Sequence, residues 1–268
     1  MQKIFLLFLI WLPLITSAQV QKGWWNADRS SLGIAPTPKN ERRAVVQIYT
    51  ARAYGWRGNF AIHPWISIKE KDAPNFSTYE VMGFSSQQGK PVIRKRNTAP
   101  DLRWYGNDPE IILDIRGEAA EEMIPDIEKA IGSYPYPETY RLFPGPNSNT
   151  FISYIMRNTT GIYIELPPHA IGKDWIGKAQ LFGVTESGTG AQFSLFGLFG
   201  ITVGLAEGIE INILGLSFGI DFWMPAIKLP FVGRLGFKDR PVFEKAEAKN
   251  SEASDAESNS WKKNIFQK

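Results

Sequence analysis

A histidine, a glutamate and a serine are the residues of this chain best suited to chemistry. His63 stands at the start of an expected strand, and Glu80 lies on the strand expected to follow it. Ser148 opens a later helix. If the two strands pair, Glu80 can orient the imidazole while His63 faces the serine, which gives an orienting group, a base and a nucleophile. A serine is a weak nucleophile unless a base activates it in this way.

The serine lies in residues 143–151, where a loop stiffened by two prolines leads into a helix. Asn147 is a typical N-cap residue. Free backbone N–H groups and the positive end of the helix dipole meet at such a first turn, where a nucleophile or an oxyanion can be held. The alternative is a well-capped helix without chemistry, and His63 can equally be a satisfied core histidine.

Composition excludes several kinds of site. The 268 residues include no cysteine and two histidines, and their net charge is +3. Disulfides, thiolate metal sites and cysteine nucleophiles are therefore excluded. His63 and His169 form no spaced ligand pair, so we expect neither a metal nor a cofactor. No basic stripe interleaved with aromatic residues is present, so we do not expect nucleic acid as a partner.

The N-terminus has the layout of a secretory signal peptide over residues 1–18. Lys3 precedes an apolar run, residues 4–15, and small residues end at Ala18. The run is too short to cross a bilayer comfortably. We predict cleavage after Ala18 and export of the mature chain, which is then periplasmic or secreted and can associate with a membrane. An uncleaved anchor is the alternative.

An arm, residues 19–43, follows the signal peptide, and its adjacent Trp24 and Trp25 predict that it packs along the domain. A domain over residues 44–180 comes next. Apolar and β-branched patterns within it predict an antiparallel meander of strands near 44–51, 60–69, 78–84 and 92–94. Helical spacing predicts helices from Pro109 to Ile115, from Glu118 to Ile131, and from Ser148 onward.

The chain changes character over residues 181–237, where glycine recurs among apolar residues. Glu207, Glu210 and Asp221 interrupt every apolar run, so short β-strands are favoured over a transmembrane helix. Peripheral membrane contact through this segment is the minor alternative. Residues 238–268 are charged and are predicted to be disordered. The predicted fold class is α+β, with an antiparallel sheet packed on the helix that Ser148 opens and a glycine-rich β extension.

The chain closely resembles a bacterial family of uncharacterised proteins, a domain of unknown function. The matching pieces include Trp56-Arg57-Gly58, Phe60-Ala61-Ile62-His63, Tyr79-Glu80-Val81 and Gly145-Pro146-Asn147-Ser148-Asn149-Thr150-Phe151. More distantly, it is similar to the circularly permuted papain-like fold of lecithin–retinol acyltransferase-like and permuted NlpC-type proteins. There a strand with the histidine comes first, and an Asn-Cys-x-x-Phe motif then opens a helix.

This resemblance implies a permuted papain-like fold with Ser148 at the nucleophile position and His63 as the base. Asn147 and Phe151 match the motif, but serine replaces the cysteine and is a poorer nucleophile than a thiolate. Two functions stay open for Ser148, His63, Glu80 and Asn147. They can form a degenerate site that binds a cell-envelope ligand, such as a peptidoglycan peptide or a lipid. Alternatively, they serve an active serine hydrolase or acyltransferase on an amide or ester.

Overall fold

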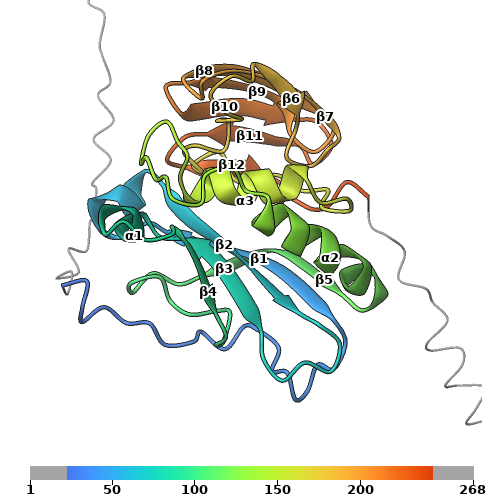
Figure 1. Ribbon diagram of the computed structural model, residues 1–268. Coiled ribbons are helices and arrows are strands. Elements are labelled where there is room, and N and C mark those ends of the chain that lie inside the picture. Colours follow the sequence, from blue (N-terminus) through green and yellow to red (C-terminus); the bar gives the residue numbers. More distant parts are fainter. Residues whose placement is uncertain (1–22, 244–268) are drawn as a thin grey trace, which may run out of the picture.

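The computed structural model describes residues 23–243, in which two antiparallel sheets enclose a layer of helices (Figure 1). The predicted signal peptide and residues 244–268 of the predicted tail lie outside the described residues. Residues 238–243 run back along the molecule, where the Val242 N–H donates to the Tyr163 carbonyl and the Val242 side chain is buried.

The first sheet has five strands in the order β4-β3-β2-β1-β5. They are β1 (Val45–Arg52), β2 (Ile62–Lys69), β3 (Ser77–Val81), β4 (Ile93–Arg96) and β5 (Glu110–Arg116). The predicted meander of four strands is confirmed, since each of β1 to β4 pairs with its neighbour in the chain. Gly83 and Phe84, expected to end the third strand, instead begin the short helix α1 (Gly83–Gln87).

The helix predicted from Pro109 to Ile115 is wrong, because this segment is strand β5 and pairs with β1. Its apolar residues serve both faces of the sheet, which a one-sided helical stripe does not do. Ile112 and Ile115 pack on the core beneath the helices, whereas Ile111 packs on the opposite cluster around Trp65. A run of β-branched residues with both faces covered favours a strand.

Helices α2 (Glu118–Gly132) and α3 (Ser148–Arg157) cover one face of the first sheet, as the helical spacing predicted. The apolar face of α3 is buried against this sheet, with Phe151, Ile152 and Ile155 fully covered. From β2, Ile62, Ile66 and Ile68 join the same core. The alternate residues of β2, including His63, therefore project toward the other face.

The other face of the first sheet is covered by the loop after β4 and by the arm. The Trp65 side chain donates to the Pro100 carbonyl, and Asp101 accepts backbone hydrogen bonds from Ile34 and Ala35. The 3₁₀ turn η1 (Gly55–Asn59) joins β1 to β2. The arm thus packs along the domain, although both Trp24 and Trp25 are exposed rather than buried against it.

The second sheet is a meander of seven strands in chain order, and it lies over α3 on the side away from the first sheet (Figure 1). Its strands are β6 (Phe182–Val184), β7 (Gly190–Leu195), β8 (Phe199–Gly204), β9 (Gly208–Ile213), β10 (Leu216–Asp221), β11 (Ala226–Leu229) and β12 (Gly233–Gly236). The glycine-rich segment is therefore β-structure, as predicted. Among residues 23–243, no helix has the length and hydrophobicity needed to cross a membrane.

Candidate ligand-binding site

His63 and Glu80 come together on adjacent strands, as the sequence predicted. β2 and β3 pair antiparallel, and the His63 Nε2 lies 3.4 Å from the Glu80 Oε2. Both side chains are almost fully buried. The carboxylate therefore fixes the orientation of the imidazole, which is the role expected of Glu80.

Two arginines of β4 hold the second oxygen of Glu80. Arg94 Nη2 lies 2.5 Å and Arg96 Nε 3.3 Å from Oε1, and Arg94 stands directly opposite Glu80 in the strand register. Burial alone would raise the pKa of Glu80, but the hydrogen bond from His63 and the charges of Arg94 and Arg96 outweigh it and lower that pKa to about 2. Glu80 is therefore anionic at neutral pH.

His63 is neutral at pH 7. Its burial lowers its pKa, the hydrogen bond and charge of Glu80 oppose that shift, and Arg94 and Arg96 add to it. Its ring stacks on Trp104, with centroids 3.5 Å apart and planes 9° apart. Because Nε2 must carry the proton that it donates to Glu80, the lone pair of the neutral ring lies on Nδ1.

Ser148 lies in the first turn of α3, and it lines the same cavity as His63. No hydrogen bond joins the two residues in the part of the chain that the structure describes. The strand alternation explains this separation: the β2 residues that contact α3 are Ile62 and its alternates, so the imidazole leaves the sheet on the other side. What the two residues share is the cavity that both of them line.

Asn147 has a positioning role. Its side chain accepts from the Thr150 N–H, and the Thr150 hydroxyl accepts from the Asn147 N–H, which makes a reciprocal cap. Its amide nitrogen donates to the carbonyls of Leu142 and Ile171. Asn147 thereby fixes the start of α3 between two loops and directs its own side chain into the protein rather than toward a ligand.

Gly172 permits this close contact. Its φ is +101°, and a Cβ at this position would lie 2.3 Å from the Asn147 amide nitrogen. A glycine is therefore required twice, for the backbone conformation and for the approach of the loop to the cap.

Sequence analysis missed Asn149, Arg94, Arg96 and Trp104 as members of the site. The Asn149 side chain donates to the carbonyls of Ile62 and Ile171, while its buried Oδ1 has no hydrogen-bond partner among the described residues. Arg94 could have been found from the predicted meander, because an opposite charge facing Glu80 is a common cross-strand pair. Trp104 gave no such signal, since it reaches His63 from a loop.

The cavity has a volume of about 880 Å³ and mainly apolar walls. Its aromatic lining comes from the arm, the turn η1, helix α1 and several loops: Trp24, Tyr54, Trp56, Phe60, Phe84, Trp104, Tyr105, Tyr140, Phe143 and Phe231. Its polar lining includes His63, Ser148 and Asn149. The cavity is thus large enough for an organic ligand and offers that ligand a few polar groups.

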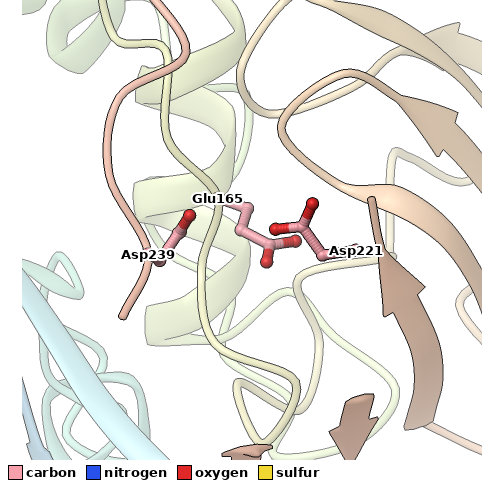
Figure 2. A group of neighbouring side chains, drawn as sticks. All are labelled: Glu165, Asp221 and Asp239. Atoms are coloured by element: carbon pink, nitrogen blue, oxygen red, sulfur yellow. The ribbon is translucent and has the colours of Figure 1, made fainter. Parts of the chain in front are cut away.

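A second cluster of ionisable residues lies between the helices and the second sheet. Figure 2 shows the carboxylates of Glu165, Asp221 and Asp239 turned toward one another, and their oxygens lie within 4.8 Å. Arg234 lies 2.5 Å from Asp221, 3.4 Å from Glu165 and 4.0 Å from Asp239, and Lys228 lies 2.5 Å from Glu165. Both cations pair with these carboxylates, so the cluster forms an ion-pair network that joins the loop after α3 and the segment after β12 to the second sheet.

The fold and the site together define a mixed α/β protein with two antiparallel sheets and few helices, in which His63, paired with the buried Glu80, lines an aromatic cavity. Residues 43–175 match the model of a family described as Protein of unknown function (DUF3750). This match includes His63, Glu80 and Ser148 and ends at Trp175, before the second sheet begins. No curated protein matches the chain, and no solved structure does.

Proposed function

We propose that this is an exported cell-envelope protein whose permuted papain-like domain binds an amphipathic envelope ligand, a lipid, in the cavity shared by His63 and Ser148. The apolar lining of the cavity is the observation that supports this proposal. Aromatic and aliphatic walls suit an acyl chain, whereas a peptidoglycan peptide would require more polar partners than these walls supply.

The polar residues that line the cavity suit an amide or ester head group. Neutral His63 offers a lone pair on Nδ1, and Ser148 offers a hydroxyl that can both donate and accept. Asn149 adds a buried carbonyl oxygen that lacks a protein partner. A head group that brings its own N–H or O–H donor therefore gains hydrogen bonds on entering the site.

The geometry favours binding over catalysis. The Ser148 hydroxyl is not hydrogen-bonded to His63 in the described chain, and the imidazole projects from the sheet face opposite α3. A nucleophilic serine depends on a base within hydrogen-bond reach, about 2.6–3.2 Å. The site keeps the oriented histidine of an acyl-transfer centre without that contact.

Ligand binding is tested by filling the cavity. Ala61 lines it, and Ala61→Trp should weaken the binding of a fluorescent fatty acid or lysophospholipid at least tenfold, measured by titration. Ala99→Trp is the matched control, because Ala99 is exposed and outside the cavity, and its affinity should equal that of the wild type. Equal affinities for all three proteins would contradict a ligand site in this cavity.

An active serine hydrolase or acyltransferase is the second candidate, favoured by the lone pair that the His63–Glu80 pair leaves on Nδ1. In that reaction the Ser148 Oγ attacks the carbonyl carbon and its proton passes to His63. The leaving amine or alcohol then takes that proton, and water or an acceptor alcohol releases the acyl group.

Fluorophosphonate labelling separates the two candidates. The binding account expects no labelling of the wild type, and Ser148→Ala should then change the stability little, because Asn147 rather than Ser148 caps α3. Labelling of the wild type that is lost in both Ser148→Ala and His63→Ala would establish the enzyme instead.

Export is a separate part of the proposal. The mature protein isolated from the cell envelope should begin at Gln19 when its intact mass is measured. Recovery of a chain that still carries Met1 would contradict cleavage.

A further inference from the structure

The outer face of the second sheet is apolar over its whole extent. The strand register places Phe182, Phe193, Ile201, Ile211 and Phe218 in one row across five strands. Four of these side chains are exposed, and Phe193 is partly so. The neighbouring rows repeat the pattern, so the outward positions of β6 to β12 hold apolar residues or glycine. Six-residue strands make this face about 20 Å wide, well beyond scattered surface hydrophobics.

The opposite face of the same sheet explains why the apolar residues point outward. Its alternate positions carry polar side chains, including Gln192, Glu210 and Lys228, all buried against the rest of the protein. Lys173 of the loop after α3 lies 2.6 Å from Glu210, and Glu210 in turn lies 3.2 Å from Lys228. The polar side chains of the inner face thus find their ion-pair and hydrogen-bond partners inside the protein. Within residues 23–243, the apolar outer face is the one left without a partner.

The fully exposed charges that flank this face along the chain have one sign. From residue 179 to residue 237 no charged side chain is exposed, because every Glu, Asp and Lys turns inward and Arg234 is partly buried. The exposed charges that border this stretch are Lys178, Lys238 and Arg240, and all three are cationic. An apolar face with a basic border is complementary to a surface of acyl chains beneath anionic head groups.

Large side chains at the turns extend the same character to the edges of the sheet. Phe222 and Trp223 are exposed between β10 and β11, and Phe196 is exposed between β7 and β8. Aromatic rings are favoured at the boundary between head groups and acyl chains.

We propose that the outer face of the second sheet docks on the surface of an anionic lipid bilayer. The sheet lies on the membrane rather than across it, since its inner face is polar and packed on the domain. A protein partner fits less well. Even the buried core of a protein interface is only about two-thirds apolar and carries regular hydrogen bonds, whereas the outward side chains here offer no polar group.

The absence of cysteine allows a site-specific test on the full chain. Ile211→Cys places an environment-sensitive fluorophore on the outer face, and Asp126→Cys places it on the exposed side of α2 as the control. With vesicles of phosphatidylcholine and phosphatidylglycerol, emission from position 211 should shift to the blue and be quenched by lipids with a spin label on the acyl chain. Position 126 should not respond. No response at position 211 would overturn the proposal, even if another segment held the chain on the vesicles.

The basic border is tested by neutralising it. Lys178→Gln, Lys238→Gln and Arg240→Gln together should weaken binding to these vesicles by roughly fivefold per side chain, with the smaller affinity for pure phosphatidylcholine unchanged. The control triple Lys39→Gln, Lys90→Gln and Lys129→Gln alters exposed lysines elsewhere. Equal losses in the two triples would mean that overall charge, not this face, attracts the lipid.

A second copy of the chain is the competing occupant of the face. It predicts that the probe at position 211 shifts to the blue as the protein concentration rises, without vesicles, and that sedimentation shows a dimer. That result would overturn the membrane proposal and make the face a dimer interface.

Discussion

Glu80 is the residue on which the electrostatics of the cavity depend, because it contacts His63 through one oxygen and two arginines through the other. Burial lowers the pKa of His63, and the negative charge of Glu80 opposes that shift. Glu80→Gln removes that charge while keeping a hydrogen-bond acceptor.

In this variant the pKa of His63, already below its usual 6.5, should fall further. The measurement is an NMR titration of the imidazole signals, assigned with His169→Gln because the chain has only two histidines. His169 serves as the internal control, since burial and the charge of Arg52 lower its pKa to about 4 and Glu80 is not among the causes. A wild-type His63 that titrates above 6.5 would contradict the described environment.

A second prediction concerns Gly172. Gly172→Ala forces a side chain into a left-handed backbone conformation and against Asn147, so it should destabilise the protein by about 1–3 kcal/mol. Gly132→Ala is the matched control: it lies at the end of α2 with nothing within 4 Å of the added methyl, and should be neutral or stabilising by about 0.5–1 kcal/mol. Urea unfolding of both variants measures the difference.

Sequence reasoning could select His63, Glu80 and Ser148 by type and by their expected elements, and it predicted the contact between His63 and Glu80. It could not decide whether His63 faces Ser148. That question depends on which alternate residues of β2 contact α3, and the core formed by Ile62, Ile66 and Ile68 settles it only in three dimensions.

At the scale of elements, Asp174 joins the domain that matches the family to the second sheet. One of its oxygens accepts from Gln192 of β7 and from Lys173, and the other accepts from Asn212 of β9 and Ser217 of β10. Burial raises the pKa of Asp174, but Lys173 and the hydrogen bonds outweigh this and lower it. The carboxylate thus anchors three strands at once.

Asp174→Asn should therefore destabilise the protein by about 3–5 kcal/mol, because it leaves buried Lys173 with less compensation and sets one amide N–H group against another. The loss of hydrogen-exchange protection should be greatest in β7, β9 and β10. Asp126→Asn, on the exposed side of α2, should leave both stability and protection unchanged. Uniform loss of protection over both sheets would mean that Asp174 stabilises the whole fold rather than the junction.

The elements were predictable where the pattern had one meaning. β1 to β4, α2, α3 and the glycine-rich strands follow their periodicity, whereas the short apolar run of β5 fits both the helical and the strand period and does not distinguish them. The sequence pattern could not predict which face of the second sheet is buried. Alternation such as Ile209-Glu210-Ile211-Asn212-Ile213 defines two faces but not which is buried, and the usual choice would bury the isoleucines. Here partners from a distant segment, Lys173 and Asp174, bury the polar face instead.

For the whole molecule, opposing pKa shifts set the range of pH in which it is stable. Glu41 and Glu80 both have pKa values lowered to about 2, Glu41 chiefly by its hydrogen bond to Arg43. Their stabilisation is present above their usual pKa of 4.5 and is lost as the pH falls toward 2. The pKa shift of Asp239 has the opposite sign, because burial raises its pKa from 3.8 to about 6 despite the nearby charge of Arg234. Its contribution is lost as the pH rises through that range.

Asp239→Asn should accordingly stabilise the protein above pH 7, by roughly 2–3 kcal/mol, and should change little near pH 4, where the wild-type carboxyl is largely protonated. Thermal unfolding at the two pH values measures this difference. Glu128→Gln, an exposed substitution on α2, is the control, and it should change the unfolding temperature by the same amount at both pH values. A larger gain for Asp239→Asn at the lower pH would reverse the sign and contradict the buried cluster.

The strand order of the second sheet also has a consequence for folding. Each strand pairs with its neighbour in the chain, so its backbone contacts are local and hairpins can add one after another. Yet the polar face gains its buried partners from Glu165, Lys173 and Asp174, which precede every strand of this sheet. The N-terminal domain emerges first during synthesis and can act as the template on which the hairpins assemble. Until they dock, those hairpins expose one apolar face and one unpaired charged face, and docking is then the step that commits the sheet to its final orientation.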